Sequence, residues 1–311
     1  METLVTVTIP VFGIILTGYL AGKFGLLSEH SAKAINAFVY YFSLPALLFL
    51  LTTKADFAEI ANFSFILVFV LGTVIVALIA AFGGRAIFGL TARPLTIHAM
   101  VSSYGNTGYM GVAIFLIAFG PGGVLPAIVA TITANILVIG IGLTLLEGFR
   151  EGAFSQGPAA LRVSKSLILN PLIMAPLLGL VVAILKLKFP APITNYLDLL
   201  GSAAAPSALF SLGLSMTIQS VKVKWGEIAW LTVIKLLLQP LVTLAIIVYL
   251  IPLPSPYFEA AIILAALPTG ASLFVIAEQY GSYTKEASAM IVCSTAGAVF
   301  TISAVFIALG I

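Results

Sequence analysis

The sequence contains few charged residues. Only 8% of its 311 residues are Asp, Glu, Lys or Arg, whereas 61% are hydrophobic and the mean hydropathy is +1.20. So few charges cannot cover the surface of a soluble domain, which predicts a chain that crosses a membrane several times. The formal net charge of +3 gives no reason to expect a nucleic-acid partner, because in a membrane protein the basic residues set the orientation.

Residues that carry common enzyme chemistry are also scarce. The single cysteine, Cys293, excludes a disulfide within the chain and a thiolate metal site. The two histidines lie far apart, and no glycine-rich phosphate loop precedes a lysine. We therefore expect no cofactor, no metal and no enzyme activity. The N-terminus lacks the basic start of a signal peptide, so we interpret it as a first spanning helix.

Long apolar runs occupy most of the chain. A helix of about 20 residues crosses about 30 Å of hydrocarbon, and ten stretches approach or exceed this length. They lie at 5–22, 34–53, 63–83, 95–119, 124–146, 166–186, 197–217, 226–250, 257–280 and 287–310. The sequence therefore predicts an all-α polytopic membrane protein with ten transmembrane helices, in contact with the lipid bilayer.

Lysine and arginine are divided unequally between the two sides that ten spans would create. One side holds 3 of them and the other holds 10, while Lys235 falls inside the eighth span. The positive-inside rule makes the basic side cytoplasmic and leaves both termini on the non-cytoplasmic side. We expect an integral protein of a bacterial inner membrane.

The longest polar stretch divides the chain into two halves. Residues 148–165 predict a cytoplasmic linker between a first five-helix repeat at 1–147 and a second at 166–311. Residues 105–120 resemble 267–281, and both lie in the fourth span of their half. Because five spans are an odd number, the second repeat inserts upside down. Inverted repeats with paired interrupted helices are typical of secondary transporters.

Helix-breaking residues interrupt the fourth and ninth spans at the same depth, at 106–108 and 268–270. Glycine permits unusual backbone angles and proline removes an N–H donor. Irregular backbone at membrane depth persists only where it is buried in protein or lines a cavity. We expect the two broken helices to cross, with half-helix N-termini that favour an anion. Asn106, Thr107 and Thr269 would orient a carboxylate or coordinate an ion.

Other polar residues in or near the spans have two open interpretations. Asn135 and Asn170 either face the cavity or join helices, and Lys235 either attracts an anion or has a structural partner. Glu259 and Glu278 bracket the ninth span, and are either interfacial or involved in proton or cation binding. The candidate substrate-binding residues are Asn106, Thr107, Gly108, Pro268, Thr269, Gly270, Asn170 and Asn135.

Four segments, GNTGYMGVAI (105–114), LPTGASLFVIAEQYG (267–281), NP (170–171) and SLPALLF (43–49), resemble the auxin efflux carrier family. This family includes plant PIN-type auxin exporters and bacterial permeases for malonate and malate. The resemblance covers essentially the whole chain. It implies an inverted-repeat fold of the bile-acid-symporter and sodium–proton-antiporter type, with a scaffold of spans 1, 2, 6 and 7, a mobile domain from the others, and a homodimer. It also implies that Asn106 and Pro268 lie at the crossing and that Asn170 binds a carboxylate.

Departures from the plant members favour a bacterial type of organic-acid carrier. Gly105 stands where many plant members have proline, the central loop is short, and the fifth span has no tyrosine. We expect a secondary transporter of a small organic anion, such as malonate, malate or an auxin-like acid, that works by an elevator movement coupled to a proton or sodium. The alternatives are a sodium-coupled organic-anion symporter of bile-acid type and a membrane sensor that binds a carboxylate without moving it.

Overall fold

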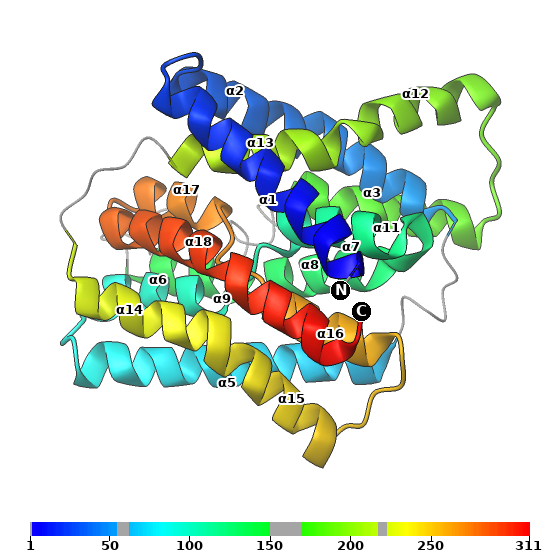
Figure 1. Ribbon diagram of the computed structural model, residues 1–311. Helices are drawn as coiled ribbons and strands as arrows, with labels where there is room; N and C mark the ends of the chain where they lie inside the picture. Colours follow the sequence, from blue (N-terminus) through cyan, green and yellow to red (C-terminus); the bar gives the residue numbers. More distant parts are fainter. Residues whose placement is uncertain (1, 55–61, 150–168, 217–222) are drawn as a thin grey trace.

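The computed structural model describes residues 2–54, 62–149, 169–216 and 223–311 (Figure 1). The regular structure in these ranges is helical, without a strand. The predicted linker at 148–165 lies outside the described residues except for its first two positions.

The helices often change pitch within one continuous rod. The α-helices are α1 (Glu2–Lys23), α2 (Glu29–Phe38), α3 (Leu44–Thr52), α5 (Phe63–Ala86), α6 (Ala92–Ser103), α7 (Val112–Phe119), α8 (Leu125–Ala134), α9 (Ile141–Gly148), α11 (Pro171–Ile184), α12 (Ala191–Ser202), α13 (Ala204–Ser215), α14 (Trp225–Val233), α15 (Gln239–Tyr249), α16 (Tyr257–Ala265), α17 (Ser272–Gln279) and α18 (Thr284–Leu309). Four π-helical turns, η1 (Val39–Ser43), η2 (Thr107–Gly111), η4 (Asn135–Gly140) and η7 (Ile234–Leu238), continue directly into a following α-helix, and η3 (Pro121–Gly123) is a 3₁₀ turn.

Within the described residues, six helices are long and apolar enough to cross a membrane, namely His30–Thr52, Phe63–Ala86, Pro121–Gly148, Ala191–Ser215, Trp225–Tyr249 and Thr284–Leu309. Each coincides with one of the predicted spans. Shorter apolar helices at Ile9–Lys23, Thr107–Phe119 and Pro171–Ile184 fall on the first, fourth and sixth predicted spans. The ninth is split between α16 and α17. The prediction of an all-α polytopic membrane protein is confirmed.

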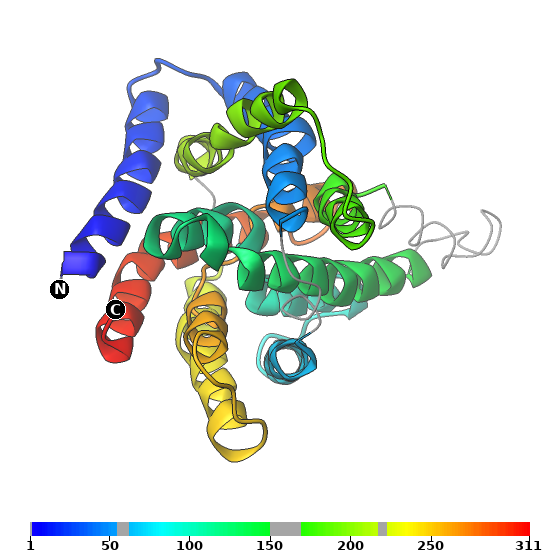
Figure 2. The ribbon, with the colours of Figure 1, turned by 90° about the vertical axis from the view of Figure 1, so that its right-hand side faces the viewer.

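The helices form two packed groups. One group, which we call the panel, comprises α1, α2, α3, α11, α12 and α13, and the other, which we call the bundle, comprises α5 to α9 and α14 to α18. Within the panel α1 packs on α13 and α3 packs on α11 and α12, whereas in the bundle α5 packs on α6 and α15. Figure 2 shows the panel helices at the top and α5, α15 and α18 below. Small residues permit this packing: a Cβ on Gly18 would lie 2.0 Å from the carbonyl oxygen of Phe210.

Both predicted interruptions are present, and they contact each other. Helix α6 ends at Ser103, α16 ends at Ala265, and Gly105 pairs with Thr269 in an isolated antiparallel bridge. The Asn106 N–H donates to the carbonyl of Pro268 at 2.8 Å, and the Gly270 N–H donates to the carbonyl of Tyr104 at 3.0 Å. The two breaks thus satisfy part of each other's exposed backbone, which makes irregular chain tolerable at this depth.

Candidate functional site

A polar cavity lies against the crossing, between the panel and the bundle. Its volume is about 400 Å³, within the usual range for small-molecule sites. Panel residues such as Asn36 and Tyr40 line one side, and residues around both breaks line the other. Six of the eight predicted binding residues belong to the lining: Asn106, Thr107, Gly108, Asn135, Asn170 and Gly270.

The cavity faces the N-terminal ends of two helices. The helix Thr107–Phe119 begins at its wall, and Ser272, the first residue of α17, also lines it. The first N–H groups of a helix have no partner within the helix, and they carry the positive end of the helix dipole. Two such ends converging on one cavity favour a bound anion.

Asn106 has a side-chain donor without a hydrogen-bond partner. Only 3% of this residue is exposed, and its backbone is fully engaged, since the carbonyl also accepts from the N–H groups of Met110 at 3.1 Å and Gly111 at 2.9 Å. The side-chain Nδ2 is buried and has no hydrogen-bond partner. A buried donor without a partner is costly, so it requires an explanation. An acceptor bound in the adjacent cavity would satisfy it.

The other amides and hydroxyls of the cavity are partly engaged. Asn135 donates through Nδ2 to the carbonyl of Thr131 at 2.8 Å and accepts from the Tyr104 hydroxyl at 3.3 Å. The hydroxyls of Thr107 and Thr131 are hydrogen-bonded at 3.0 Å. Asn170 caps α11, where its Oδ1 accepts from the Leu172 N–H at 2.9 Å. These contacts fix the side chains around the cavity.

Pro268 and Thr269 lie at the crossing but outside the cavity lining. Thr269 is completely buried; its hydroxyl donates to the carbonyl of Val101 at 2.7 Å, and its N–H donates to Ser294 Oγ at 3.1 Å. Val101 lies in the last turn of α6, where carbonyls lack intrahelical partners. Thr269 therefore caps the C-terminal end of the other broken helix.

Lys235 and Gln239 contact the crossing but do not line the cavity. Lys235 is fully buried, and its Nζ donates to Gln239 Oε1 at 2.6 Å and to the carbonyl of Ala265 at 3.1 Å. Gln239 Nε2 in turn donates to the carbonyl of Ser103 at 3.3 Å. Ala265 and Ser103 are the last residues of α16 and α6. A cationic side chain thus lies at the negative ends of both half-helices, which is the structural partnership that the sequence left open.

The two predicted glutamates lie away from the crossing. Glu278 lines a second cavity of about 260 Å³ together with Lys33, and this cavity shares Asn36, Ala271 and Val275 with the first. Glu259 lies in the first turn of α16, at the end remote from the crossing, and lines neither cavity. Among the described residues no three His, Cys, Asp or Glu side chains are grouped as metal ligands.

Sequence reasoning missed several residues of the cavity wall. Asn36, Tyr40 and Ser272 line it, although none was a candidate. Asn36 gave a usable signal, because it is a polar residue inside a predicted span. Tyr40 and Ser272 gave none, since their place depends on how the panel packs against α17.

Helices of membrane length identify the chain as an integral membrane protein, and a cavity lies beside its two interrupted helices. The sequence pattern of the membrane transport protein family matches residues 3–306, and the chain belongs to this family. The resemblance to the auxin efflux carriers is thereby confirmed.

Several similar proteins carry transporter or carrier names. A Rhizobium meliloti protein named "Putative malonate transporter" is 32% identical over 314 residues, which cover 97% of this chain and 95% of the relative. "Uncharacterized transporter YfdV" of Escherichia coli K12 is 29% identical and covers 94% and 93%. "Auxin efflux carrier component 8" of Arabidopsis thaliana is 36% identical over 126 residues, which cover 39% of this chain and 34% of the relative.

Proposed function

We propose that this protein is a secondary transporter of a small carboxylate of about the size of malonate. The observation that carries the proposal is the buried Asn106 Nδ2, which lacks a partner beside a cavity bounded by two helix N-termini. An ionised carboxylate is an acceptor only, so it complements both the amide donor and the exposed N–H groups. The name of the Rhizobium relative supports the same substrate class.

The arrangement of the two groups supports an elevator movement. In the proposed mechanism the chain has ten spans in two inverted repeats, the panel is the fixed scaffold, and the bundle moves with the substrate. The cavity is lined by both groups, so sliding of one past the other would open it to each side in turn. Transport requires similar affinity in both states, since a ligand shifts the equilibrium only by its differential affinity.

The proposal also includes the setting of the transporter. It is a homodimer in a bacterial inner membrane, with the basic helix ends cytoplasmic and both termini on the other side. Asn106 and the helix N-termini bind the carboxylate, Asn135, Asn170 and Thr107 shape the cavity, and Thr269 and Lys235 stabilise the crossing from outside it. The coupling ion is a proton.

Thermal unfolding with a ligand panel tests the substrate class. Purified protein is heated with malonate, malate, acetate or indole-3-acetate, with and without sodium. Because a ligand that binds only the folded state raises its stability, malonate should raise the melting temperature of the wild type and not that of Asn106→Ala. If no acid stabilises the wild type, the carboxylate assignment fails. Stabilisation that requires sodium would replace it with the bile-acid type of symporter.

Counterflow in proteoliposomes separates a transporter from a sensor. Vesicles loaded with unlabelled malonate should take up labelled malonate from outside, and this exchange needs no net driving force. Binding without counterflow would identify a carboxylate sensor and overturn the proposed transport. Asn106→Ala is the matched variant, and it should lose counterflow in proportion to its loss of affinity.

A further inference from the structure

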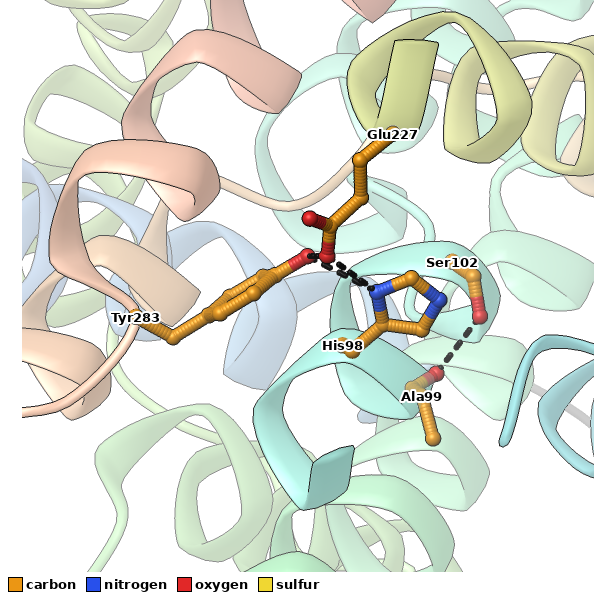
Figure 3. A network of polar contacts seen from close by, with 5 residues as sticks. All are labelled: His98, Ala99, Ser102, Glu227 and Tyr283. Carbon is orange, nitrogen blue, oxygen red and sulfur yellow. Dashed lines mark hydrogen bonds and ion pairs between the residues drawn. The ribbon is translucent and has the colours of Figure 1, made fainter. Parts of the chain in front are cut away.

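A second buried polar cluster lies in the bundle, away from the carboxylate cavity. It consists of His98 on α6, Glu227 in the first turn of α14, and Tyr283, the residue before α18 (Figure 3). Their exposed fractions are 0%, 2% and 8%. His98 Nδ1 lies 3.0 Å from Glu227 Oε1 and 2.7 Å from the Tyr283 hydroxyl, which itself hydrogen-bonds to the same carboxylate oxygen.

The hydrogen bonds of the cluster show which ring nitrogen of His98 has no partner. Glu227 accepts from the Tyr283 hydroxyl, and burial together with this hydrogen bond raises the pKa of Tyr283, so its proton stays on the oxygen. An ionised carboxylate accepts only, so His98 Nδ1 must carry a proton to face it. In the neutral ring Nε2 is then an acceptor, and it is buried without a hydrogen-bond partner.

Helix α5 packs closely on this edge of the ring. A Cβ added to Gly84 would lie 3.1 Å from His98 Nε2 and 2.9 Å from the adjacent ring carbon. Glycine at this position therefore permits the close approach of α5 to the imidazole, and a larger residue would displace the ring. A proton added at Nε2 would convert the ring into an imidazolium held against the Glu227 carboxylate.

Charged groups around the cluster lie outside it or have other partners. Lys224, at the exposed N-cap of α14, acts on Glu227 from the solvent side, and Glu286 on α18 acts on Tyr283. On α5 the Arg85 guanidinium donates to the carbonyl of Leu90 at 3.3 Å. Further charged residues belong to elements that pack on α6. Glu147 of α9 accepts from the Tyr280 hydroxyl at 2.7 Å, Lys235 of η7 is bound at the crossing, α17 carries Glu278, and α18 also carries Lys285.

We propose that His98 Nε2 binds the proton that accompanies the carboxylate through the transport cycle. With neutral His98 the three side chains carry the single negative charge of Glu227, and with the proton they carry none. A net buried charge is unfavourable, and the bound proton removes it. The proton also offsets one charge of an anionic substrate, which lowers the cost of moving the loaded bundle against a membrane potential. This inference rests on the proposed transport function.

The cluster is placed to communicate with the crossing. His98 lies on the helix that leads to Asn106, and Tyr283 follows the short turn after α17, the second half of the other broken helix. Glu227 lies on α14, which continues through η7 to Lys235. Protonation at one atom therefore acts on the elements that position both halves of the carboxylate site.

Nitrogen NMR of the two histidines tests the proton site directly. With ¹⁵N-labelled imidazole, His30→Gln leaves His98 as the only signal. We expect acidification to convert the neutral Nδ1–H tautomer into the imidazolium. Saturating malonate should favour the imidazolium at a given pH, because coupling between two ligands is reciprocal. A ring that keeps one state at every pH at which the protein is folded, or a proportion of the two forms that malonate leaves unchanged, would overturn the inference.

Transport by His98→Gln tests the coupling. We expect malonate counterflow within about twofold of wild type and a loss of about tenfold or more in accumulation driven by a pH gradient. His30→Gln, at an exposed position, should keep both activities. Gradient-driven accumulation that survives in His98→Gln contradicts the inference. Absence of counterflow in the wild type would instead refute the transport function. If His98→Gln does not fold, the NMR titration in the His30→Gln protein remains decisive.

Discussion

The two interruptions look alike in sequence but solve different problems in the fold. At the first, Asn106 uses its backbone to hold the crossing, and its buried side-chain Nδ2 has no hydrogen-bond partner beside the cavity. At the second, Thr269 gives both its hydroxyl and its N–H to partners inside the protein. Matching breakers at matching depth therefore do not imply matching roles. In the proposed site the first break binds the carboxylate, whereas the second holds the crossing together.

A methyl group at position 270 should have the largest effect. A Cβ there would lie 2.4 Å from the Tyr104 ring, whereas at Gly105 the nearest atoms are 3.5 Å away. Overpacking costs about 1–3 kcal/mol and sometimes more, so Gly270→Ala should lower the melting temperature sharply and Gly105→Ala should change it little. Size-exclusion chromatography and thermal unfolding of both variants give the comparison. Equal melting temperatures would show that the crossing is looser than described.

Loss of the Asn106 amide should be the largest effect on binding. A hydrogen bond to a charged group contributes about 1.5–3 kcal/mol, which corresponds to a roughly tenfold to hundredfold weaker Kd for malonate. The protein should remain as stable as wild type, because Nδ2 has no partner to lose. Isothermal titration and thermal unfolding measure the two quantities separately. A destabilised Asn106→Ala with normal affinity would reverse the roles of the two breaks.

Removal of the Lys235 ammonium should weaken the crossing. Lys235→Met leaves Gln239 Oε1 and the Ala265 carbonyl without this donor, at a cost of about 2 kcal/mol in unfolding free energy. Because Lys235 does not line the cavity, the Kd for malonate at a temperature where the variant is folded should change less than that of Asn106→Ala. A larger loss of affinity would mean that Lys235 attracts the anion itself.

Thr269→Val should have the smallest effect of the four variants. In contrast to Asn106→Ala, it should lower stability and leave malonate affinity unchanged. The valine keeps the shape and the N–H, but the Val101 carbonyl loses its donor. We expect a loss of about 1 kcal/mol in stability and an unchanged Kd for malonate. Unfolding in increasing concentrations of a denaturing detergent compares the stability of Thr269→Val with that of wild type. A weaker Kd without loss of stability would return Thr269 to the substrate site.

The residues at each break were enough to predict where the helices are interrupted, but not which polar side chain faces the cavity. Glycine and proline act on the backbone where they stand, so 105–108 and 268–270 could be identified from the sequence. Whether Asn106 or Thr269 faces the cavity depends on which carbonyl of α6 lies opposite, and only the packed structure specifies this. The same reason explains why Asn36 and Ser272 escaped notice.

The partners of buried charged residues were even harder to predict from the sequence. His98 was predictable only as a lone histidine near a helix end, since its partners Glu227 and Tyr283 are 129 and 185 residues away in sequence. Lys235 was identified from the sequence with two open roles, and only the packed structure reveals its bond to the Ala265 carbonyl. Long-range pairing of single polar residues leaves no periodic signal in an apolar chain.

The most direct test of the central claim is calorimetric titration of malonate into wild type, Asn106→Ala and Thr269→Val under identical conditions. We predict that malonate binds wild type and Thr269→Val with the same affinity, and Asn106→Ala about tenfold or more weakly. Equal affinity for all three proteins would contradict the assignment of the carboxylate to the crossing.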